Sequence, residues 1–360
     1  MKRILLFIDI LNSGGAQRQI VGLAGLLKEK GYGVKIITYF DKNFYSSFLE
    51  AMEVEVENVN GGDNYLKRIP LVAKAITSYA PDIVISYLDT PSLITCLLKK
   101  LRIIKCPIIV SERNTTQKLT RALRLKFHLL RYADAIVSNS YSQAEYIKEH
   151  FPNLTPKLSV ITNFVDLEYF APAEKPNIKN PKSIICVGRI SPQKNVLQFL
   201  EVISRLVKVF PSVRVDWYGN AMGEYAERCR NLISEKGIND YFAFHEPDPD
   251  IRDRYREYSI FCLPSLWEGF PNVLCEAMSC GMPVVCGDVC DNRKIVQGTK
   301  NGILFNPSDN DDMFNKISEM LNLPVERREE MGHKSREIAI TLFSKETFVK
   351  QYINLIKSLC

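Results

Sequence analysis

The stretch "RILLFIDILNSGGAQRQIVGLAGLLKEKGYGVKIITYF", residues 3–40, contains two apolar runs separated by a longer amphipathic segment. The first run reads as a buried strand, because it is short, almost continuously apolar and followed by turn residues. The segment from residue 15 onward repeats apolar residues at helical spacing and ends at Gly31. A strand, a helix and a second strand in this order predict a parallel sheet that is covered by helices.

The alternation of apolar strands and helix-period segments runs through the chain and restarts once. Between the two series lies "NFVDLEYFAPAEKPNIKNPK", residues 163–182, which is rich in proline and lacks periodicity, as linkers do. We therefore predict an α/β protein with two doubly wound, Rossmann-like domains that face each other across a cleft at their carboxyl strand ends. The expected parts are a first domain at 1–165, a linker at 166–182, a second domain at 183–343, and a final helix at 344–360, whose packing on the first domain the sequence leaves open.

Composition is typical of a soluble globular protein. The 360 residues suffice for two cores, and no apolar run reaches the roughly 18–20 residues that span a bilayer. The first residues read as a buried strand rather than a signal peptide, so we expect a cytoplasmic protein. The ten cysteines match no zinc pattern and lie mostly in apolar segments, which predicts reduced core thiols. The net charge of +6 lies in residues 1–170, which hold 22 basic and 16 acidic side chains, against 25 of each in the remainder.

A glycine pair in "NSGGAQR", residues 12–18, lies between the first expected strand and helix. Gly14 and Gly15 have no Cβ, so their backbone can approach a ligand, and the helix N-terminus offers N–H groups to an anion. The motif is not GxGxxG and lacks the acidic residue about 20 positions later, which disfavours a nicotinamide cofactor. A plain strand-to-helix turn is an equally good interpretation of this pair.

Two cations follow the first strand of the second domain. In "VGRISPQKN", residues 187–195, Arg189 comes directly after the strand and Lys194 precedes a helix. Parallel sheets bind ligands at the carboxyl ends of their strands, and an arginine fork beside a lysine point charge suits a diphosphate. Either cation alone would more commonly be an ordinary solvated side chain.

Two glutamates lie further along, in "SLWEGFPNVLCEAMSCGMP", residues 265–283. Glu268 falls in an expected loop, and Glu276 falls on the helix that begins near Pro271. Carboxylates repel phosphate, so beside a diphosphate site they are expected to accept hydrogen bonds from hydroxyl groups. A ligand that has a sugar on each side of a diphosphate, one sugar for each glutamate, is a nucleotide-sugar.

Six segments, "GGAQR", "SERN", "NFVD", "VGRISPQKN", "EGFPNVLCE" and "AMSCGMPVV", resemble the retaining glycosyltransferases of the GT-B fold, family 4, over nearly the full chain. The resemblance implies that Arg189, Lys194 and Glu268 are catalytic, with the cations on the departing diphosphate and Glu268 on the transferred sugar. It implies a nucleotide diphosphate-sugar donor, with UDP favoured, and no metal or other cofactor. The donor-binding residues that it implies are Gly14, Gly15, His245, Phe270, Pro271, Asn272, Val273 and Glu276, the last of them on the ribose.

The acceptor side is less marked in the sequence. Some relatives have a histidine where this chain has Arg113, and we expect Arg113, Glu112 and Asp89 to lie near the acceptor. The departing phosphate oxygen can accept the acceptor's proton, so no separate protein base is required. Two other functions stay open, a nucleotide-sugar 2-epimerase of the same fold and a nucleotide-sugar-binding protein without catalysis. An epimerase needs acid and base groups, which the four scattered histidines do not obviously supply. A binding protein without catalysis would be indicated by loss of the two cations or of the two glutamates, and this chain has all four.

A basic segment in the first half suggests where the acceptor lies. "KLTRALRLKFHLLRY", residues 118–132, mixes cations with leucines as an amphipathic helix does. Such helices bind anionic membranes at about 1 kcal/mol per well-placed cation, and the alternative is a domain helix with solvated cations. We expect a peripheral enzyme on the inner face of the cell membrane that extends a lipid-linked saccharide of a lipopolysaccharide, capsule or similar glycan. Nucleic acid is not expected as a partner, and the oligomeric state is not indicated. The cations expected to face the membrane are Lys118, Arg121, Arg124 and Lys126.

Overall fold

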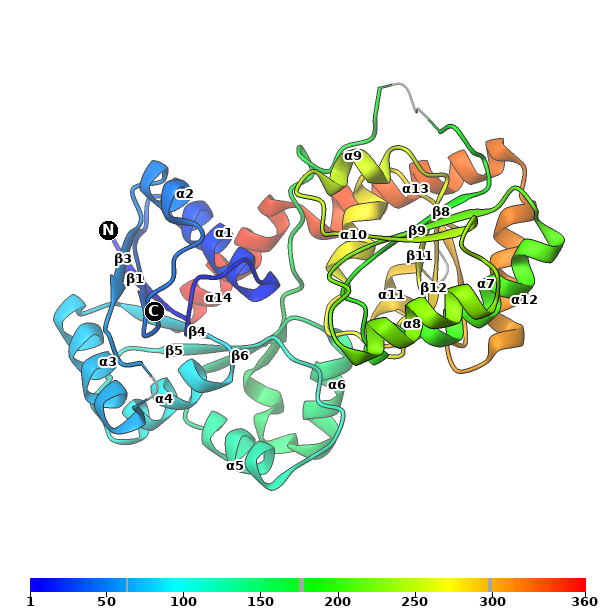
Figure 1. Cartoon of the computed structure of the whole chain (residues 1–360). Coiled ribbons are helices and arrows are strands. Elements are labelled where there is room, and N and C mark those ends of the chain that lie inside the picture. Colours follow the sequence, from blue (N-terminus) through cyan, green and yellow to red (C-terminus); the bar gives the residue numbers. More distant parts are fainter. Residues whose placement is uncertain (63, 175–177, 297–299) are drawn as a thin grey trace. The chain divides into compact units, whose positions relative to one another are not determined.

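The computed structural model describes the whole chain except residues 63, 175–177 and 297–299, so part of the expected linker lies outside the described residues. The chain divides into two compact units. The first unit combines Met1–Phe164 with Lys345–Cys360, and the second unit is Val165–Ser344. In Figure 1, which is coloured from blue to red along the sequence, the red helix α14 is therefore part of the same unit as the blue and cyan elements.

The first unit is built on a seven-stranded sheet with the order β3-β2-β1-β4-β5-β6-β7, in which every pairing is parallel. Parallel neighbours need a crossover connection, and the helices between them supply it. The elements are β1 (Arg3–Phe7), α1 (Gly15–Glu29), β2 (Gly33–Thr38), α2 (Ser46–Ala51), β3 (Glu55–Asn58), α3 (Tyr65–Tyr79), β4 (Ile83–Tyr87), α4 (Asp89–Lys100), β5 (Ile108–Glu112), α5 (Arg121–Leu130), β6 (Ala135–Ser138), α6 (Tyr141–His150), β7 (Leu158–Val160) and α14 (Lys345–Leu359).

Both faces of this sheet are covered, which explains why its strands are almost continuously apolar. Ile4 and Leu6 of β1 pack in one cluster with α1 and α14, whereas Leu5 and Phe7 pack in another with α3, α4 and α5. The sequence left the place of the final helix open. The structure settles it, because α14 contributes four buried residues, including the fully buried Tyr352, to the same core as α1.

The second unit contains a six-stranded sheet with the order β10-β9-β8-β11-β12-β13, again parallel throughout. Residues of β8 that point to one face pack with α7, α8 and α12, and those that point to the other pack with α9, α10 and α13. The elements are β8 (Ser183–Val187), the short 3-10 helix η2 (Pro192–Lys194), α7 (Val196–Val209), β9 (Arg214–Tyr218), α8 (Glu224–Glu235), β10 (Phe242–His245), α9 (Ile251–Tyr255), β11 (Ile260–Leu263), α10 (Asn272–Ser279), β12 (Val284–Gly287), α11 (Asn292–Val296), β13 (Gly302–Phe305), α12 (Asn310–Asn322) and α13 (Val325–Phe343).

The chain enters and leaves the second unit at one place. The backbone N–H of Val165 donates to the carbonyl of Phe343 at 2.8 Å, so the entering and leaving segments lie side by side. Just before this point, Phe164 is held in the first unit, since Gln19 exchanges two hydrogen bonds with its backbone, at 2.9 and 3.0 Å. The ring of Phe164 also lies 5.0 Å from that of Phe348 on α14.

Helices α10 and α13 pack closely through two glycines. A Cβ on Gly332 of α13 would lie 2.1 Å from the carbonyl oxygen of Gly281, which follows α10. No real Cβ comes so close to an oxygen, so any larger residue at this position must push the two segments apart.

Substitution of Gly332 by alanine therefore tests this packing. Alanine is about 1 kcal/mol better than glycine in a helix interior, but forced overpacking typically costs about 1–3 kcal/mol, and here the obstacle is backbone. We expect Gly332→Ala to lower the free energy of unfolding measured by urea denaturation. Gly25→Ala on α1 is the matched control, because its new Cβ first meets the flexible methyl group of Met52, at 3.0 Å. Equal or greater stability of Gly332→Ala would contradict the contact.

Candidate functional site

The strand order of the second unit reverses between β8 and β11. The chain passes from β8 outward to β9 and β10, and then returns to β11 on the other side of β8. The loops after β8 and β11 therefore leave one edge of the sheet at its topological switch point, where open parallel sheets bind ligands. Arg189 and Lys194 lie in the first of these loops, and Glu268 lies in the second.

Lys194 is paired directly with Glu268. Its Nζ lies 2.6 Å from Oε1 of Glu268, and the two side chains are only 13% and 7% exposed. Gly188 leaves room for the lysine, because a Cβ there would lie 3.0 Å from the lysine Cε, and its φ of +149° also favours glycine. The pair orients a nearly buried carboxylate and balances its charge. The sequence predicted the two residues as neighbours of one ligand but did not predict that they bind each other.

Arg189 differs from Lys194 in having no such partner. Its side chain is exposed, and in the part of the chain that the structure describes it forms no ion pair. The loop that carries it is fixed by backbone hydrogen bonds, from Gly188 to the carbonyl of Tyr218 and from Ile190 to that of Asn220. A guanidinium on a fixed loop at the switch point is available to an anionic ligand.

Helix α10 begins at the same edge. Pro271 is its N-cap residue, and no side chain caps the helix. One backbone group that we expected to face a ligand is used locally, since the N–H of Asn272 donates to the carbonyl of Phe270 at 2.9 Å. The ring of Phe270 is buried, 5.8 Å from that of Phe343. Among residues 270–273, which we expected to bind the donor, Phe270 thus contributes to packing. The start of α10, which has no side-chain cap, still carries the positive end of the helix dipole.

Glu276 lies one turn into α10 and is 7% exposed. The hydroxyl of Tyr255, itself buried, donates to Oε2 of Glu276 at 3.4 Å. A mostly buried carboxylate that is held by a tyrosine is suited to accept further hydrogen bonds from hydroxyl groups of a ligand. The structure thus places Glu268 just before α10 and Glu276 on it, as the sequence predicted.

His245 ends β10 beside two residues of β9 that the sequence analysis did not single out. Its Nε2 lies 2.5 Å from Oδ1 of Asp216, and its ring stacks on that of Tyr218 with centroids 4.6 Å apart. The parallel register places His245 directly opposite Tyr218. Residues two apart in a strand share a face, so the alternation in "VRVDWYG" was a signal that would have put Asp216 and Tyr218 together.

The strand order of the first unit reverses between β1 and β4. After β1, Gly14 is the N-cap residue of α1, which has no side-chain cap, and Gly15 is exposed. Gly14 has a φ of −76°, which any residue adopts, and a Cβ on it would first meet the flexible amide of Gln17. The backbone conformation therefore does not require glycine at position 14. Gly14 and Gly15 leave the N-terminus of α1 uncovered by side chains at the switch point.

A buried ionic cluster follows the next two strands of this unit. Asp89 begins α4 after β4, Glu112 ends β5, and Lys126 of α5 reaches both, with its Nζ 2.7 Å from Asp89 Oδ1 and 2.5 Å from Glu112 Oε2. Burial raises the pKa of Glu112, an effect that the charge of Lys126 opposes. Burial by itself would lower the pKa of Lys126, but the two carboxylates outweigh it and raise that pKa.

The placement of Lys126 corrects one expectation. Of the four cations expected to face a membrane, Lys118, Arg121 and Arg124 are exposed, whereas the side chain of Lys126 is only 4% exposed. Two carboxylates at the strand ends attract it inward, because a buried acid is stable only when it is paired. Leu125 of the same helix is 61% exposed next to the exposed cations.

Arg113 has a structural role that the sequence did not suggest. It is buried, and its guanidinium donates to Oδ1 of Asn163 at 2.7 Å and to the hydroxyl of Tyr352 at 3.1 Å. It also lies over the ring of Tyr87, 4.0 Å from the centroid. Arg113 therefore fixes α14 within the first unit. The other two residues expected near the acceptor, Asp89 and Glu112, also have protein partners, since both pair with Lys126.

Several buried polar atoms lack a hydrogen-bond partner within the described chain, and most of them lie at or just beyond the carboxyl ends of strands. Such atoms mark places where a bound water or ligand completes the hydrogen bonding. Both switch-point edges are therefore polar surfaces that are not satisfied by the protein alone. The buried polar atoms without a partner belong to Ser111, Glu112, Arg113 and Asn139 in the first unit, and to Ser191, Ser265 and Asn292 in the second.

Removal of Lys126 tests the buried cluster. Lys126→Met leaves Glu112 buried and unpaired, which typically costs about 3–5 kcal/mol of stability at neutral pH. The loss should shrink as the pH falls through the folded-state pKa of Glu112, because the protonated acid needs no partner and that pKa is already raised. Urea denaturation at several pH values measures this, with the exposed Arg124→Met as control. A loss that is independent of pH between 4 and 8, or a double variant with Glu112→Gln that recovers nothing, would contradict the pairing.

Two family models match the chain in succession. The model described as Glycosyltransferase Family 4 matches residues 13–169, and the model described as Glycosyl transferases group 1 matches residues 170–338. Among curated proteins, the chain is 25% identical over 335 residues, covering 89% of each chain, to the GalNAc-alpha-(1->4)-GalNAc-alpha-(1->3)-diNAcBac-PP-undecaprenol alpha-1,4-N-acetyl-D-galactosaminyltransferase of Campylobacter jejuni. It is 31% identical over 173 residues, 45% of this chain and 44% of the relative, to the UDP-Gal:alpha-D-GlcNAc-diphosphoundecaprenol alpha-1,3-galactosyltransferase of Escherichia coli.

Solved structures share the fold. Anabaena Alr3699/HepE, in complex with UDP and glucose, aligns over 100% of both chains with a TM-score of 0.85 at 19% identity. The lipopolysaccharide outer core galactosyltransferase WaaB aligns over 99% of both with a TM-score of 0.76 at 20% identity. These likenesses and the two parallel-sheet units confirm the expected fold class. None of the helices among the described residues combines the length and the apolar character of a membrane span. With both family models matched in order along its length, the chain belongs to the glycosyltransferases of the GT-B fold, family 4.

Proposed function

We propose that the protein is a retaining glycosyltransferase that moves a sugar from a nucleotide diphosphate-sugar, with UDP favoured, to a hydroxyl of a lipid-linked saccharide. The observation that carries this proposal is the arrangement at one edge of the second sheet. An exposed arginine, a lysine, an uncapped helix start and two nearly buried glutamates lie there, at Arg189, Lys194, α10, Glu268 and Glu276. Cations suit the diphosphate, and carboxylates suit the hydroxyl groups on either side of it.

The chemical task is to stabilise the leaving group. The bond between the anomeric carbon and the phosphate oxygen breaks, a bond from that carbon to the acceptor oxygen forms, and negative charge grows on the departing diphosphate. Preorganised positive groups stabilise that charge most in the transition state. Arg189, Lys194 and the start of α10 supply them, so the proposed reaction requires no metal ion.

The pairing of Lys194 with Glu268 suggests how donor binding and chemistry are linked. Lys194 shares its charge with the carboxylate of Glu268. A bound diphosphate attracts Lys194 as well, and the hydroxyls of the sugar then offer Glu268 new donors in exchange. The residue on the sugar is thus oriented by the residue on the phosphate.

On the acceptor side, we assign Asp89 and Glu112 as the groups nearest the incoming hydroxyl. Both lie beyond strand ends of the first sheet, and Oε1 of Glu112 has no hydrogen-bond partner within the described residues. The acceptor's proton passes to the departing phosphate oxygen, on the face from which the leaving group departs. The new bond forms on that same face, which gives retention without a protein base.

Two observations favour a lipid-linked acceptor. The Campylobacter jejuni and Escherichia coli relatives are named for saccharides linked to undecaprenol through a diphosphate. In this chain, α5 and the short segment before it expose Lys118, Arg121 and Arg124 around the exposed Leu125. A basic surface with an exposed leucine suits an anionic membrane, so we propose a peripheral enzyme on the cytoplasmic face, in the assembly of a surface polysaccharide such as lipopolysaccharide or capsule.

The two glutamates should respond differently to substitution by glutamine. Hydrogen bonds to a charged group contribute about 1.5–3 kcal/mol, so Glu276→Gln should weaken the binding of UDP about 10- to 100-fold in calorimetry. Glu268→Gln should bind UDP at least as tightly as the wild type, because Lys194 is released from its pair. Its turnover of the nucleotide-sugar should nevertheless fall about 100-fold, as for the loss of one transition-state contact.

The control for both variants is Glu319→Gln, which changes an exposed glutamate paired with Lys316 on α12. A panel of nucleotide-sugars, assayed for slow hydrolysis with and without a chelator, identifies the donor used in these measurements. If Glu268→Gln loses UDP affinity while Glu276→Gln keeps it, the two assignments are reversed. If both variants turn over donor normally, or if chelator abolishes hydrolysis, the proposed donor mechanism fails.

The membrane contact is tested by sedimentation with vesicles. The wild type should bind vesicles that contain anionic lipid at low salt and release them at high salt, since screening weakens exposed charges. A triple variant that replaces Lys118, Arg121 and Arg124 by alanine should lose this binding and keep slow hydrolysis of the donor. The matched control removes three exposed cations of the second unit, Lys208, Lys236 and Lys334. Equal binding to neutral and anionic vesicles, or equal losses in both triple variants, would contradict a specific membrane face.

A further inference from the structure

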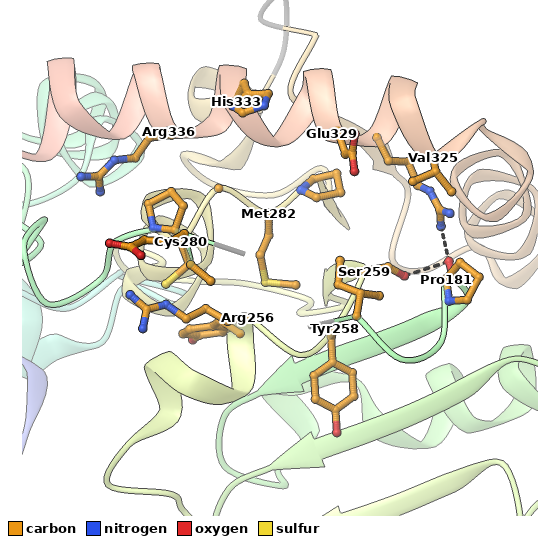
Figure 2. Close-up of a pocket in the computed structure, with 18 residues that line it drawn as sticks. Pro181, Arg256, Tyr258, Ser259, Cys280, Met282, Val325, Glu329, His333 and Arg336 are labelled. Carbon is orange, nitrogen blue, oxygen red and sulfur yellow. Dashed lines mark hydrogen bonds between the residues drawn. The ribbon is translucent and has the colours of Figure 1, made fainter. Parts of the chain in front are cut away.

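The second unit contains a cavity of 580 Å³ at the edge of its sheet opposite to the proposed donor site (Figure 2). It is lined by residues near the starts of strands: Ser259 directly precedes β11, Pro283 directly precedes β12, and Pro181 lies two residues before the start of β8. The donor residues follow the far ends of β8 and β11. Strands of four or five residues rise about 3.3 Å per residue, so roughly 13–17 Å of sheet separates the two places. The cavity has the size of a small-molecule site, and it shares one wall residue with the surroundings of the donor site, because the hydroxyl of Tyr255 donates to Glu276.

The cavity wall contains a buried cation without a counter-charge. Arg328 of α13 is 6% exposed, its Nη1 donates to the carbonyl oxygen of Pro181 at 2.5 Å, and its Nε has no partner. Within the described residues it forms no ion pair, and burial lowers its pKa. An unpaired, buried guanidinium is costly to maintain, and an anion bound beside it would remove that cost.

Two more arginines surround this space. Arg336 donates to the carbonyl oxygens of Phe170, Ser279 and Leu167, with no carboxylate among its partners. Arg256 contacts Asp253 at 3.1 Å. Figure 2 shows Arg336, His333 and Glu329 on the helix that covers the cavity, with Arg256 below it.

The remaining wall shows what kind of anion would fit. Val325, the first residue of α13, lies on it, and this helix start has no side-chain cap and so presents positive partial charge. The apolar part includes Pro172, Tyr255 and Met282. Two carboxylates, those of Glu174 and Glu329, also line the cavity, and they oppose an anion.

We propose that this cavity binds an organic phosphate monoester with an apolar or aromatic body, its phosphate at Arg328 and its body against the apolar wall. The site goes beyond the proposed transfer reaction, because it lies at the other edge of the sheet from the donor. Arginine and a helix start suit a phosphate, whereas the apolar wall disfavours a free inorganic ion. A ligand there would also lie beside the arginines that hold the backbone of residues 167–171.

The test is calorimetry of the full chain with phenyl phosphate, compared with inorganic phosphate and benzyl alcohol. Phenyl phosphate should bind at one saturable site, more tightly than either comparison compound. Binding should persist in Lys194→Ala, which removes a donor-site cation at the opposite edge. Arg328→Met should weaken binding at least about tenfold, as loss of a charged hydrogen-bonding partner does.

A second variant keeps the test decisive if Arg328→Met does not fold. Glu329 is exposed, so Glu329→Gln leaves the core intact but removes a repelling charge, and it should tighten binding about two- to fivefold, as a surface charge pair does. The control is Glu330→Gln, next along α13, which pairs with Arg327 and does not line the cavity. The proposal is overturned if phenyl phosphate shows no saturable binding, if benzyl alcohol binds equally, if Lys194→Ala abolishes binding, or if Glu329→Gln and Glu330→Gln have the same effect.

Discussion

Parallel pairing of the strands is the constraint on which the rest of this structure depends. Every strand contact in both sheets is parallel, so every strand within a sheet ends at the same edge, and each connection must return across a face of the sheet. The faces are therefore largely apolar and used for packing, and most polar groups of the candidate sites lie at the edges. Residues far apart in sequence, such as Arg189 and Glu268, meet at one edge because their strands, β8 and β11, are neighbours.

Both units use a lysine to stabilise a carboxylate at such an edge, with different degrees of burial. In the first unit Lys126 joins α5 to the ends of β4 and β5 and is 4% exposed. In the second unit Lys194 joins the loops after β8 and β11 and is 13% exposed. In the first unit Lys126 and Glu112 are buried and link α5 to β5, while Asp89 beside them keeps 40% of its side chain exposed. The second pair lies at a switch point and is partly accessible from the surface.

Much of the fold followed from the sequence, because its signals are local. The strands and helices, the α/β class and the doubly wound pattern depend on periodicity, and the positions of Arg189, Lys194, Glu268 and Glu276 depend on which strand each one follows. The sequence could not predict which side chains from different strands and helices contact one another. The burial of Lys126 depends on the ends of β4 and β5, which lie 37 and 14 residues away in sequence. From the sequence alone it is one more cation on a basic amphipathic helix.

The same limit applies to Arg113 and His245. Arg113 holds Tyr352 across 239 residues of sequence, so its motif alone gave no hint of a structural role. His245 was expected at the donor site from the family resemblance, but Asp216 and Tyr218 were not, although the register of β9 and β10 puts them beside it. The alternation of residues along β9 was visible in the sequence, but the sequence did not show that β10 pairs with β9.

The side-by-side crossing at Val165 and Phe343 has a consequence for how the protein is made. The second unit is a continuous insert within the first, with its two ends hydrogen-bonded to each other. On the ribosome, the insert is complete once residue 344 has emerged, whereas the first unit still lacks α14. Until residues 345–360 leave the ribosome, Ile4, Leu6 and the inner face of α1 have no cover from that helix. The part of the protein that is synthesised first is thus the part that finishes folding last, and a nascent chain that stops early exposes an apolar surface that chaperones and proteases recognise.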